Sequence, residues 1–268
     1  MHYEAIPFTF KTILLIACGL EFFMMTIAWF MQERMKNAAI VDVAWSKGFT
    51  MCALLYALLG QGAPVRKIVI VAMVMCWSMR LAIHCWTRIL REKEEDKRYA
   101  EMRQKWKDSA SWKFFLMFQF QGLTVVGLSV PFLLACRDPL SYLRVNEYIA
   151  IGLFALSLLG EVIADRQLDH FKANAANKGE VCNVGLWKYS RHPNYFFEWM
   201  IWCSFALFVI LSPHGNWALL SPMAMLLFLT TLSGIPLAEK QSLLSKGEKY
   251  KVYQHETSPF IPWFRRRV

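Results

Sequence analysis

Apolar residues of this chain gather in long runs that short polar segments separate. A helix needs roughly 20 apolar residues to cross a bilayer, and several runs approach or reach that length. We count seven predicted spans, at 6–30, 39–59, 68–90, 114–135, 147–164, 196–212 and 217–237. Asp42, Ser46 and Lys47 make the second the most interrupted of them. The pattern predicts an all-α integral membrane fold with about seven transmembrane helices.

The composition agrees with a membrane protein, because 56% of the residues are hydrophobic and 15% aromatic, well above an ordinary soluble domain. We find no linker, low-complexity tract or internal repeat, and predict a single polytopic domain over residues 1–268. We expect no cleavable signal peptide, because no basic region precedes the first run and no small-residue cleavage site follows it. The seven cysteines form no Cys-x-x-Cys pair and the histidines no His-x-x-x-His pair. We therefore expect free thiols and no metal site.

The net charge of +10 follows the order of the predicted loops. Of the 30 Lys and Arg residues, 22 fall in 31–38, 91–113, 165–195 and the C-terminal tail, which alternate spans place on one side. The positive-inside rule puts that side in the cytoplasm and the N-terminus outside, in a bacterial inner membrane or an endoplasmic reticulum. The charge thus reflects topology and gives no reason to expect a nucleic acid or an obligate protein partner. Membrane lipid or a phosphorylated cofactor are the expected partners of the cations.

Polar residues form three stripes at helical spacing within the apolar runs. Arg80, His84, Arg88 and Arg91 share one face of the third span. Because an unpaired cation in hydrocarbon costs at least about 2.5 kcal/mol, Arg80 and Arg88 need partners, either structural acids or a ligand.

A second stripe, Glu161, Asp165 and Lys172, continues where the fifth span leaves the membrane. Its charges suit pairing with the basic stripe and suit the ribose or amide of a nucleotide equally well. Asp42 and Ser46 share a face of the second span. Asp42 is either a proton donor, since burial disfavours its charged form, or a carboxylate neutralised by Lys47 or Arg80.

The segment 185–198 carries the densest set of reactive groups: Arg191, His192, Asn194, Tyr195 and Glu198. They stand at the mouth of a predicted span, where ionisable residues indicate a functional site by default. The Gly-rich cradles of Rossmann and Walker nucleotide sites are absent from the sequence. Any nucleotide would therefore lie among helices and loops, with Arg and Lys on its phosphates.

Several segments together resemble a known family. They are 41–45, 95–99, 121–122, 161–198, Glu239–Gln241, Tyr250–Tyr253 and Phe260–Pro262. The chain is similar to the C-terminal domain of the steroid 5-alpha-reductase superfamily, and most similar to its mostly bacterial branch. The resemblance covers a reductase-like core over about 40–264, with a cofactor-binding half over about 147–264.

This resemblance implies a cavity open to the cytoplasm in which NADPH lies among the last helices. It implies dinucleotide contacts for Asp165 and Asn194, and plausible ones for Glu161 and Lys172; Glu198 matches an acid shared by the wider group. Asp42 stands about where the reductases have the acid that polarises the substrate carbonyl. Trp77 stands where they have the assisting Tyr.

The Arg191, His192 and Tyr195 pattern with Glu239 is also similar to the isoprenylcysteine carboxyl methyltransferases, in which it helps to bind S-adenosylmethionine. Hydride transfer and methyl transfer to a lipid or lipidated acceptor therefore both stay open. A third hypothesis is a non-enzymatic scaffold in which the stripes only pair with each other.

Our leading prediction is an NADPH-dependent reductase that transfers hydride to a conjugated C=C bond of a steroid-like or other lipid enone. Asp42, with Ser46, would act on the carbonyl oxygen. We expect four cations to contact the phosphates or to pair with the acids that orient the cofactor. They are Arg80, Arg88, Lys172 and Arg191. His192 and Tyr195 complete the predicted cofactor site with Asp165, Asn194, Glu161 and Glu198.

Overall fold

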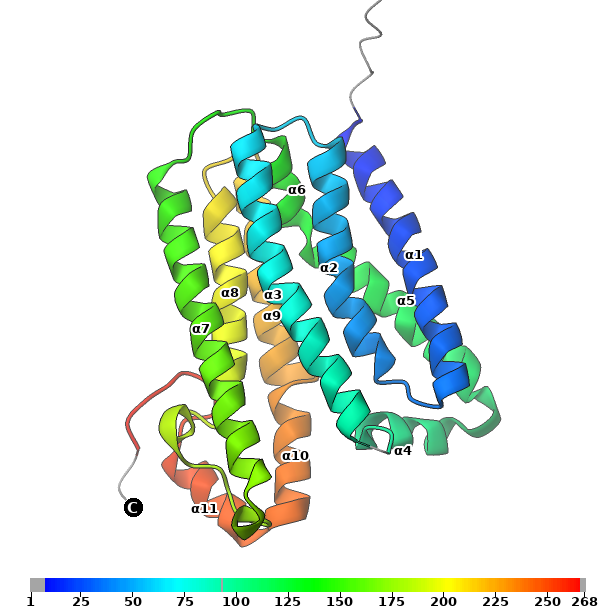
Figure 1. Cartoon of the computed structure of the whole chain (residues 1–268), viewed down its shortest axis with the longest axis vertical. Helices are drawn as coiled ribbons and strands as arrows, with labels where there is room; N and C mark the ends of the chain where they lie inside the picture. The colour runs from blue at the N-terminus through cyan, green and yellow to red at the C-terminus, as the bar shows by residue number, and fades with distance from the viewer. Residues whose placement is uncertain (1–7, 93, 266–268) are drawn as a thin grey trace, which may run out of the picture. The chain divides into compact units, whose positions relative to one another are not determined.

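The computed structural model describes residues 8–92 and 94–265, and every regular element in these ranges is a helix (Figure 1). The all-α prediction is confirmed. Six helical segments are long and apolar enough to cross a membrane: Phe10–Met35, Ile40–Leu59, Pro64–Arg91, Lys97–Arg137, Val145–Ala173 and Gly215–Lys246. The first two residues of the predicted span 6–30 lie outside the described residues, as do the last three of the chain.

The prediction of seven spans differs from these six at residues 196–212. This stretch lies mostly in α8 (Pro193–Val209), a helix of 17 residues. At 1.5 Å of rise per residue such a helix is about 25 Å long, somewhat less than the roughly 30 Å of a hydrocarbon core. Pro193 fixes its first turn, because proline is suited to that position and cannot continue a preceding helix.

The chain divides into two compact units, the first formed by 1–143 with 212–217 and the second by 144–211 with 218–268. In the first unit α1 (Phe10–Met35), α2 (Ile40–Leu59) and α3 (Pro64–Arg91) follow one another, and α1 and α2 both pack against α5 (Ala110–Leu128). A break at Ser129 separates α5 from α6 (Val130–Arg137). The predicted span 114–135 is therefore two helices.

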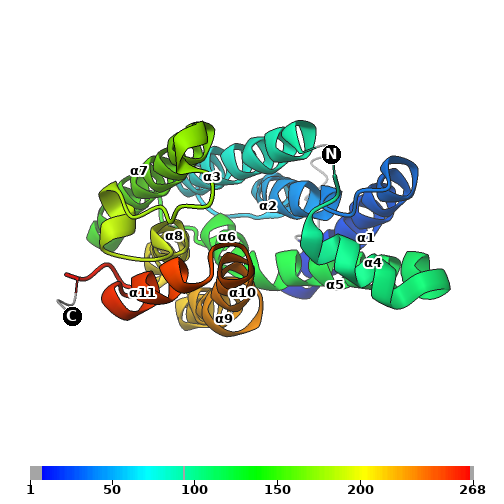
Figure 2. The same cartoon turned by 90° about the horizontal axis from the view of Figure 1, so that it is seen from below.

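At one end of this unit, backbone groups of two loops bond to each other. The Gly62 N–H donates to the Cys136 carbonyl at 2.7 Å, and the Ala63 N–H to the Asp138 carbonyl at 2.9 Å. A Cβ on Gly62 would lie 2.5 Å from that Cys136 oxygen, so only glycine permits the approach. At the other end, α4 (Lys97–Trp106) lies across the unit and brings charged residues to the start of α2 and the end of α3 (Figure 2).

In the second unit the long α7 (Val145–Ala173) packs along α8, which also contacts α9 (Leu220–Leu227). A π-helical turn at Phe228–Leu232 joins α9 to α10 (Ile235–Lys246), and α11 (Glu248–Glu256) follows. Tight-packing residues such as Trp202, Phe205 and Phe208 are fully buried on α8. The predicted cofactor-binding segment 147–264 falls in this unit, apart from 212–217.

Candidate functional site

Asp42 of the first unit accepts hydrogen bonds from three side chains. Its Oδ2 accepts from Arg88 Nη2 at 3.2 Å and from Arg98 Nη2 at 3.3 Å. Its Oδ1 accepts from the Tyr99 hydroxyl at 2.8 Å. Hydrogen bonds from guanidinium groups to a carboxylate are charge-assisted and stronger than those between neutral groups. Asp42 is therefore the acceptor at the centre of a charge cluster at one end of the unit.

Asp96 completes this cluster from the N-cap of α4. It accepts from the Arg98 backbone N–H at 3.0 Å, which starts the helix, and its Oδ2 lies 3.5 Å from Arg88 Nη2. Burial acts to raise the pKa of Asp96, but the hydrogen bonds and charge of Arg98, with the charge of Arg88, outweigh it and lower this pKa. The cluster thus holds two carboxylates with two guanidinium groups.

The other predicted residues of this unit are Ser46, Arg80 and Trp77. The Ser46 hydroxyl donates to the Asp42 carbonyl oxygen of its own helix at 2.8 Å, and Arg80 is half-buried on α3. Trp77 is fully buried and its ring lies 5.2 Å from that of Phe49.

Sequence reasoning did not assign Arg98 and Tyr99 to the site. The sequence feature that could have identified them is the segment 95–99, which contains both residues and carried part of the family resemblance. The tertiary structure brings this segment beside Asp42, 56 and 57 residues away in the chain.

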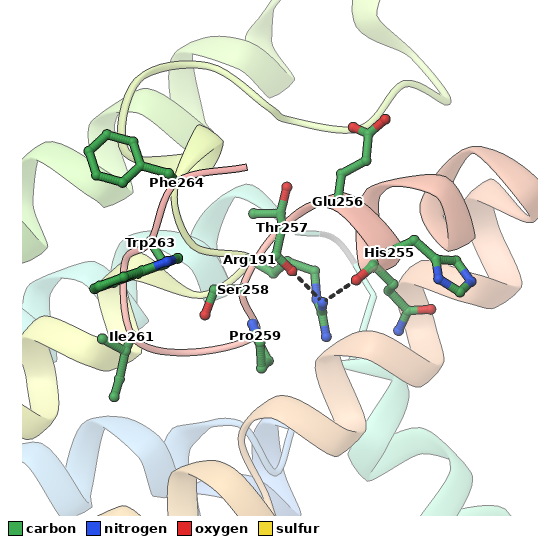
Figure 3. Close-up of a pocket in the computed structure, with 10 residues that line it drawn as sticks. Arg191, His255, Glu256, Thr257, Ser258, Pro259, Ile261, Trp263 and Phe264 are labelled. Carbon is green, nitrogen blue, oxygen red and sulfur yellow. Dashed lines mark hydrogen bonds between the residues drawn. The ribbon is translucent and has the colours of Figure 1, made fainter. Parts of the chain in front are cut away.

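In the second unit, Arg191 ties three segments together. Its Nε donates to Glu239 Oε1 of α10 at 2.6 Å. Its Nη1 donates to the carbonyl oxygens of Gln254 at 2.8 Å and Thr257 at 2.6 Å, at the end of α11 (Figure 3). Arg191 is only 9% exposed, and its planar donors match these fixed acceptors as a lysine would not. We call Arg191 and its acceptors the arginine clamp.

Glu239 also receives two further contacts. His192 Nε2 lies 3.4 Å from Glu239 Oε1, and Gln254 Nε2 donates to Oε2 at 2.8 Å. Nearby, burial and the charge of Glu239 raise the pKa of Tyr250 to about 12. Arg191 is thus paired with an acid of α10, Glu239.

The backbone geometry of the loop before α8 places Arg191 beside Glu239. Gly185 has a φ of +55°, and a Cβ there would collide with the Gln167 side chain. Gln167 Oε1 accepts the next backbone N–H, that of Leu186, at 2.9 Å, and Trp187 Nε1 donates to the Ala164 carbonyl at 2.9 Å. These bonds hold the loop on α7 just before Pro193 starts α8.

A pocket of about 420 Å³ lies beside the arginine clamp and is bordered by the chain after α11. Figure 3 shows Arg191 on one side of it and Pro259, Ile261, Trp263 and Phe264 around it. Trp263 and Phe264 are 68% and 78% exposed. Exposed aromatic side chains of this kind are enriched at membrane interfaces.

Asn194 and Asp165 meet between α8 and α7. Asn194 Nδ2 donates to Asp165 Oδ1 at 3.3 Å. The Asn194 Oδ1 atom is buried and has no hydrogen-bond partner among the residues that the structure describes. A buried acceptor left in this state costs about 1–3 kcal/mol. The rings of His192 and Tyr195 stack on each other, with their centroids 5.4 Å apart.

Glu161 and Glu198 are buried members of the same two helices. They are 4% and 7% exposed, and Glu198 Oε1 accepts from the Trp202 indole N–H at 2.9 Å. Glu198 therefore has at least one partner within its own helix.

Lys172 stands exposed near the end of α7, where the sequence expected a phosphate or acid contact. The structure adds Lys246, because both cations act on the thiol of buried Cys182. Burial raises the pKa of Cys182, while the bond to the Val184 backbone and the two lysines oppose that rise. Burial and the charge of Lys172 lower the pKa of Lys246, and an anion beside the two cations would oppose that effect.

The fold and these clusters define a multi-pass helical membrane protein with ionic groups concentrated at helix ends. Comparison with known proteins narrows this class: a family model described as "Protein of unknown function (DUF1295)" matches residues 28–257, and the chain belongs to that family. An uncharacterized protein of Schizosaccharomyces pombe is 26% identical over 296 residues, covering 97% of this chain and 81% of the relative. No solved structure matches.

Proposed function

We propose that this protein is a membrane-embedded, NADPH-dependent reductase that acts on the conjugated C=C bond of a lipid enone. The observation that carries the proposal is the buried Asn194 Oδ1, which accepts no hydrogen bond from the described residues. A nicotinamide carboxamide has an N–H₂ group that fits such an acceptor. Its resemblance to the steroid 5-alpha-reductase superfamily supports the same cofactor.

The second unit offers groups of the right chemistry for the rest of the cofactor. Asp165 beside Asn194 suits a ribose hydroxyl, because a carboxylate accepts two such bonds. Lys172 and Lys246 suit phosphate groups. NADPH would supply the hydride, and the protein's part would be binding, orientation and exclusion of water. The arginine clamp holds the segment just before α8, the helix that carries Asn194. Arg191 is therefore assigned no phosphate contact in this scheme.

In the first unit, the Asp42–Tyr99 pair is the candidate for polarising the substrate carbonyl. It combines an acid and a phenol, the two groups that the related reductases use, although the phenol comes from α4 and not from the position of Trp77. Arg88 and Arg98 would fix the position of Asp42. The Tyr99 hydroxyl, which donates its one O–H to Asp42 when no substrate is bound, would turn to donate it to the substrate oxygen. The substrate oxygen would then gain a hydrogen bond as negative charge develops on it.

A second candidate is methyl transfer from S-adenosylmethionine to a lipid or lipidated acceptor. The pairing of Asp42 with two guanidinium groups favours it, because that reaction needs no acid in this region. The Arg191–Glu239 pair also occurs in the pattern shared with the isoprenylcysteine carboxyl methyltransferases.

Ligand titration of the full-length protein in detergent separates these functions. We expect NADPH to bind, NADH to bind less tightly, and Asn194→Ala to weaken NADPH about tenfold, as the loss of one buried hydrogen bond implies. Asn183→Ala is the matched control, because Asn183 is exposed in the loop before Gly185.

Selective binding of S-adenosylmethionine would overturn the reductase proposal in favour of the methyltransferase. Binding of neither nucleotide would favour the scaffold. Equal losses in Asn194→Ala and Asn183→Ala would remove Asn194 from the cofactor site.

A further inference from the structure

Glu21 is an ionisable residue near the middle of α1 that the proposed function does not use. It is 1% exposed and lies within the apolar segment Phe10–Met35. Acids inside membrane helices are costly and indicate functional sites by default. The groups that approach it from Gly48, Cys52 and Gly122 belong to the first unit.

The Glu21 carboxyl group is incompletely satisfied. Its Oε1 accepts a weak bond from Cys52 Sγ at 3.6 Å. Its Oε2 is buried and has no partner among the described residues. Such an atom costs about 1–3 kcal/mol in the fold, a cost that a ligand could relieve.

Two glycines leave room for this carboxyl group. A Cβ on Gly48 of α2 would lie 2.8 Å from Oε2 and 2.9 Å from Oε1, so a larger residue would displace the carboxyl group. On α5, a Cβ on Gly122 would lie 3.5 Å from the Glu21 Cβ. Glu21 is therefore held where α1, α2 and α5 meet.

A groove between α1 and α5 leads toward the same residue. It measures about 310 Å³, and Glu21, Gln119 and Gly122 line it together with Phe22 and Leu123. Phe22 is 56% and Leu123 60% exposed, which opens the groove to the surroundings of the helices. Gln119 adds an amide and donates to Thr26 Oγ1 at 3.3 Å.

We propose that this groove binds a lipophilic molecule whose hydroxyl or carbonyl oxygen hydrogen-bonds to Glu21. A neutral oxygen fits better than a cation, because burying a charged pair adds a desolvation cost that hydrocarbon does not repay. A carboxylic acid has one O–H to donate, and both a hydroxyl and a carbonyl oxygen accept it. The site does not depend on NADPH and goes beyond the proposed function.

A hydrophobic carbodiimide, dicyclohexylcarbodiimide, tests the site in the full-length protein. The carboxyl oxygen bonds to the central carbon of the reagent while the acid proton moves to one nitrogen. An oxygen-to-nitrogen acyl shift then gives a stable acylurea with no leaving group. We expect mass spectrometry to locate the adduct on Glu21, and Glu21→Gln to remove it.

Competing lipophiles then test the recognition of oxygen. Dodecanol and 2-dodecanone are expected to slow labelling about tenfold relative to dodecane, as one hydrogen bond implies. Absence of an adduct on Glu21, or equal slowing by dodecane, would overturn the proposal. If only one of the two oxygen compounds protects, the ligand class narrows to alcohols or to ketones.

Two tryptophan substitutions on α5 test access through the groove. Leu123→Trp fills the groove and is expected to slow labelling about tenfold or more, because a bulky ring excludes the reagent. Leu116→Trp is the matched control, since Leu116 is 49% exposed on α5 and does not line the groove. Equal rates in the two variants would overturn the assigned route, and apparent melting temperatures show that both are folded.

Discussion

Individual charged residues of this protein gain their meaning from the partners that the fold gives them. The sequence indicated that Arg80 and Arg88 need partners, because charges in apolar surroundings are expensive. It suggested Lys47 or Arg80 for Asp42, whereas the structure pairs Asp42 with Arg88 and Arg98. Helical spacing shows which residues of one helix share a face, but not which face of another helix they meet.

Replacing Asp42 tests its assigned role in catalysis. Asp42→Asn keeps an acceptor for Tyr99 but removes the charge between Arg88 and Arg98. On the reductase proposal we expect turnover to fall about 100-fold or more, because Tyr99 loses the carboxylate that positions it, and losing one donor to a developing oxyanion costs about 100- to 1,000-fold. NADPH affinity should stay nearly unchanged. NADPH oxidation with a steroid enone such as progesterone, alongside a binding titration, measures both quantities.

Asp108→Asn is the control for that experiment, because Asp108 is exposed on the same unit. Equal losses of turnover and NADPH affinity in Asp42→Asn would assign Asp42 to the stability of the charge cluster instead of catalysis.

At the scale of helices, the arginine clamp shows how short elements are fixed by one side chain. Arg191 precedes α8, Glu239 belongs to α10, and the acceptor carbonyls stand at the end of α11. These helices are short, and α10 and α11 bury few of their own residues. Their placement within the second unit therefore depends on polar contacts more than on packing.

We expect Arg191→Lys to destabilise the protein by about 2 kcal/mol or more, since a hydrogen bond to a charged group contributes roughly 1.5–3 kcal/mol. Lysine keeps the charge but cannot reach Glu239 and two carbonyl oxygens with one planar group. The measurement is apparent thermal unfolding in detergent. Arg166→Lys is the control, because Arg166 is an exposed residue of α7. A melting temperature equal to that of the control would show that the clamp contributes little.

For the whole molecule, the number of membrane crossings decides whether the two termini lie on the same side or on opposite sides. Six segments qualify by length and composition, and the charge distribution predicts termini on opposite sides, which needs an odd number of crossings. The described helices meet that requirement if α8 crosses as well. The sidedness of the N-terminus itself concerns residues outside those that the structure describes.

Fusions to green fluorescent protein and alkaline phosphatase in a bacterial host test this topology. We expect a C-terminal fluorescent fusion to be bright and a C-terminal phosphatase fusion to be inactive, with the reverse for fusions truncated after Ser141. Ser141 is exposed in the loop before α7, and the charge count places that loop outside. The same result at both positions would contradict the predicted orientation.

The sequence by itself determined that this is a helical membrane protein and where most of its helices run. Long apolar runs are a local property, and a helix satisfies its own backbone groups in hydrocarbon. Residue types also indicated where polar and ionic groups gather at the ends of the apolar runs, and Asp165, Asn194 and Arg191 were singled out there as candidate site residues.

Only the tertiary structure decided which groups meet. The pairs Asp42–Tyr99, Arg191–Glu239 and Glu21–Cys52 join residues 57, 48 and 31 positions apart. Glu21 escaped sequence reasoning because one acid in a long apolar run barely changes its hydropathy. Its significance comes from the space that glycines on two other helices leave around it, and that space exists only after the helices pack.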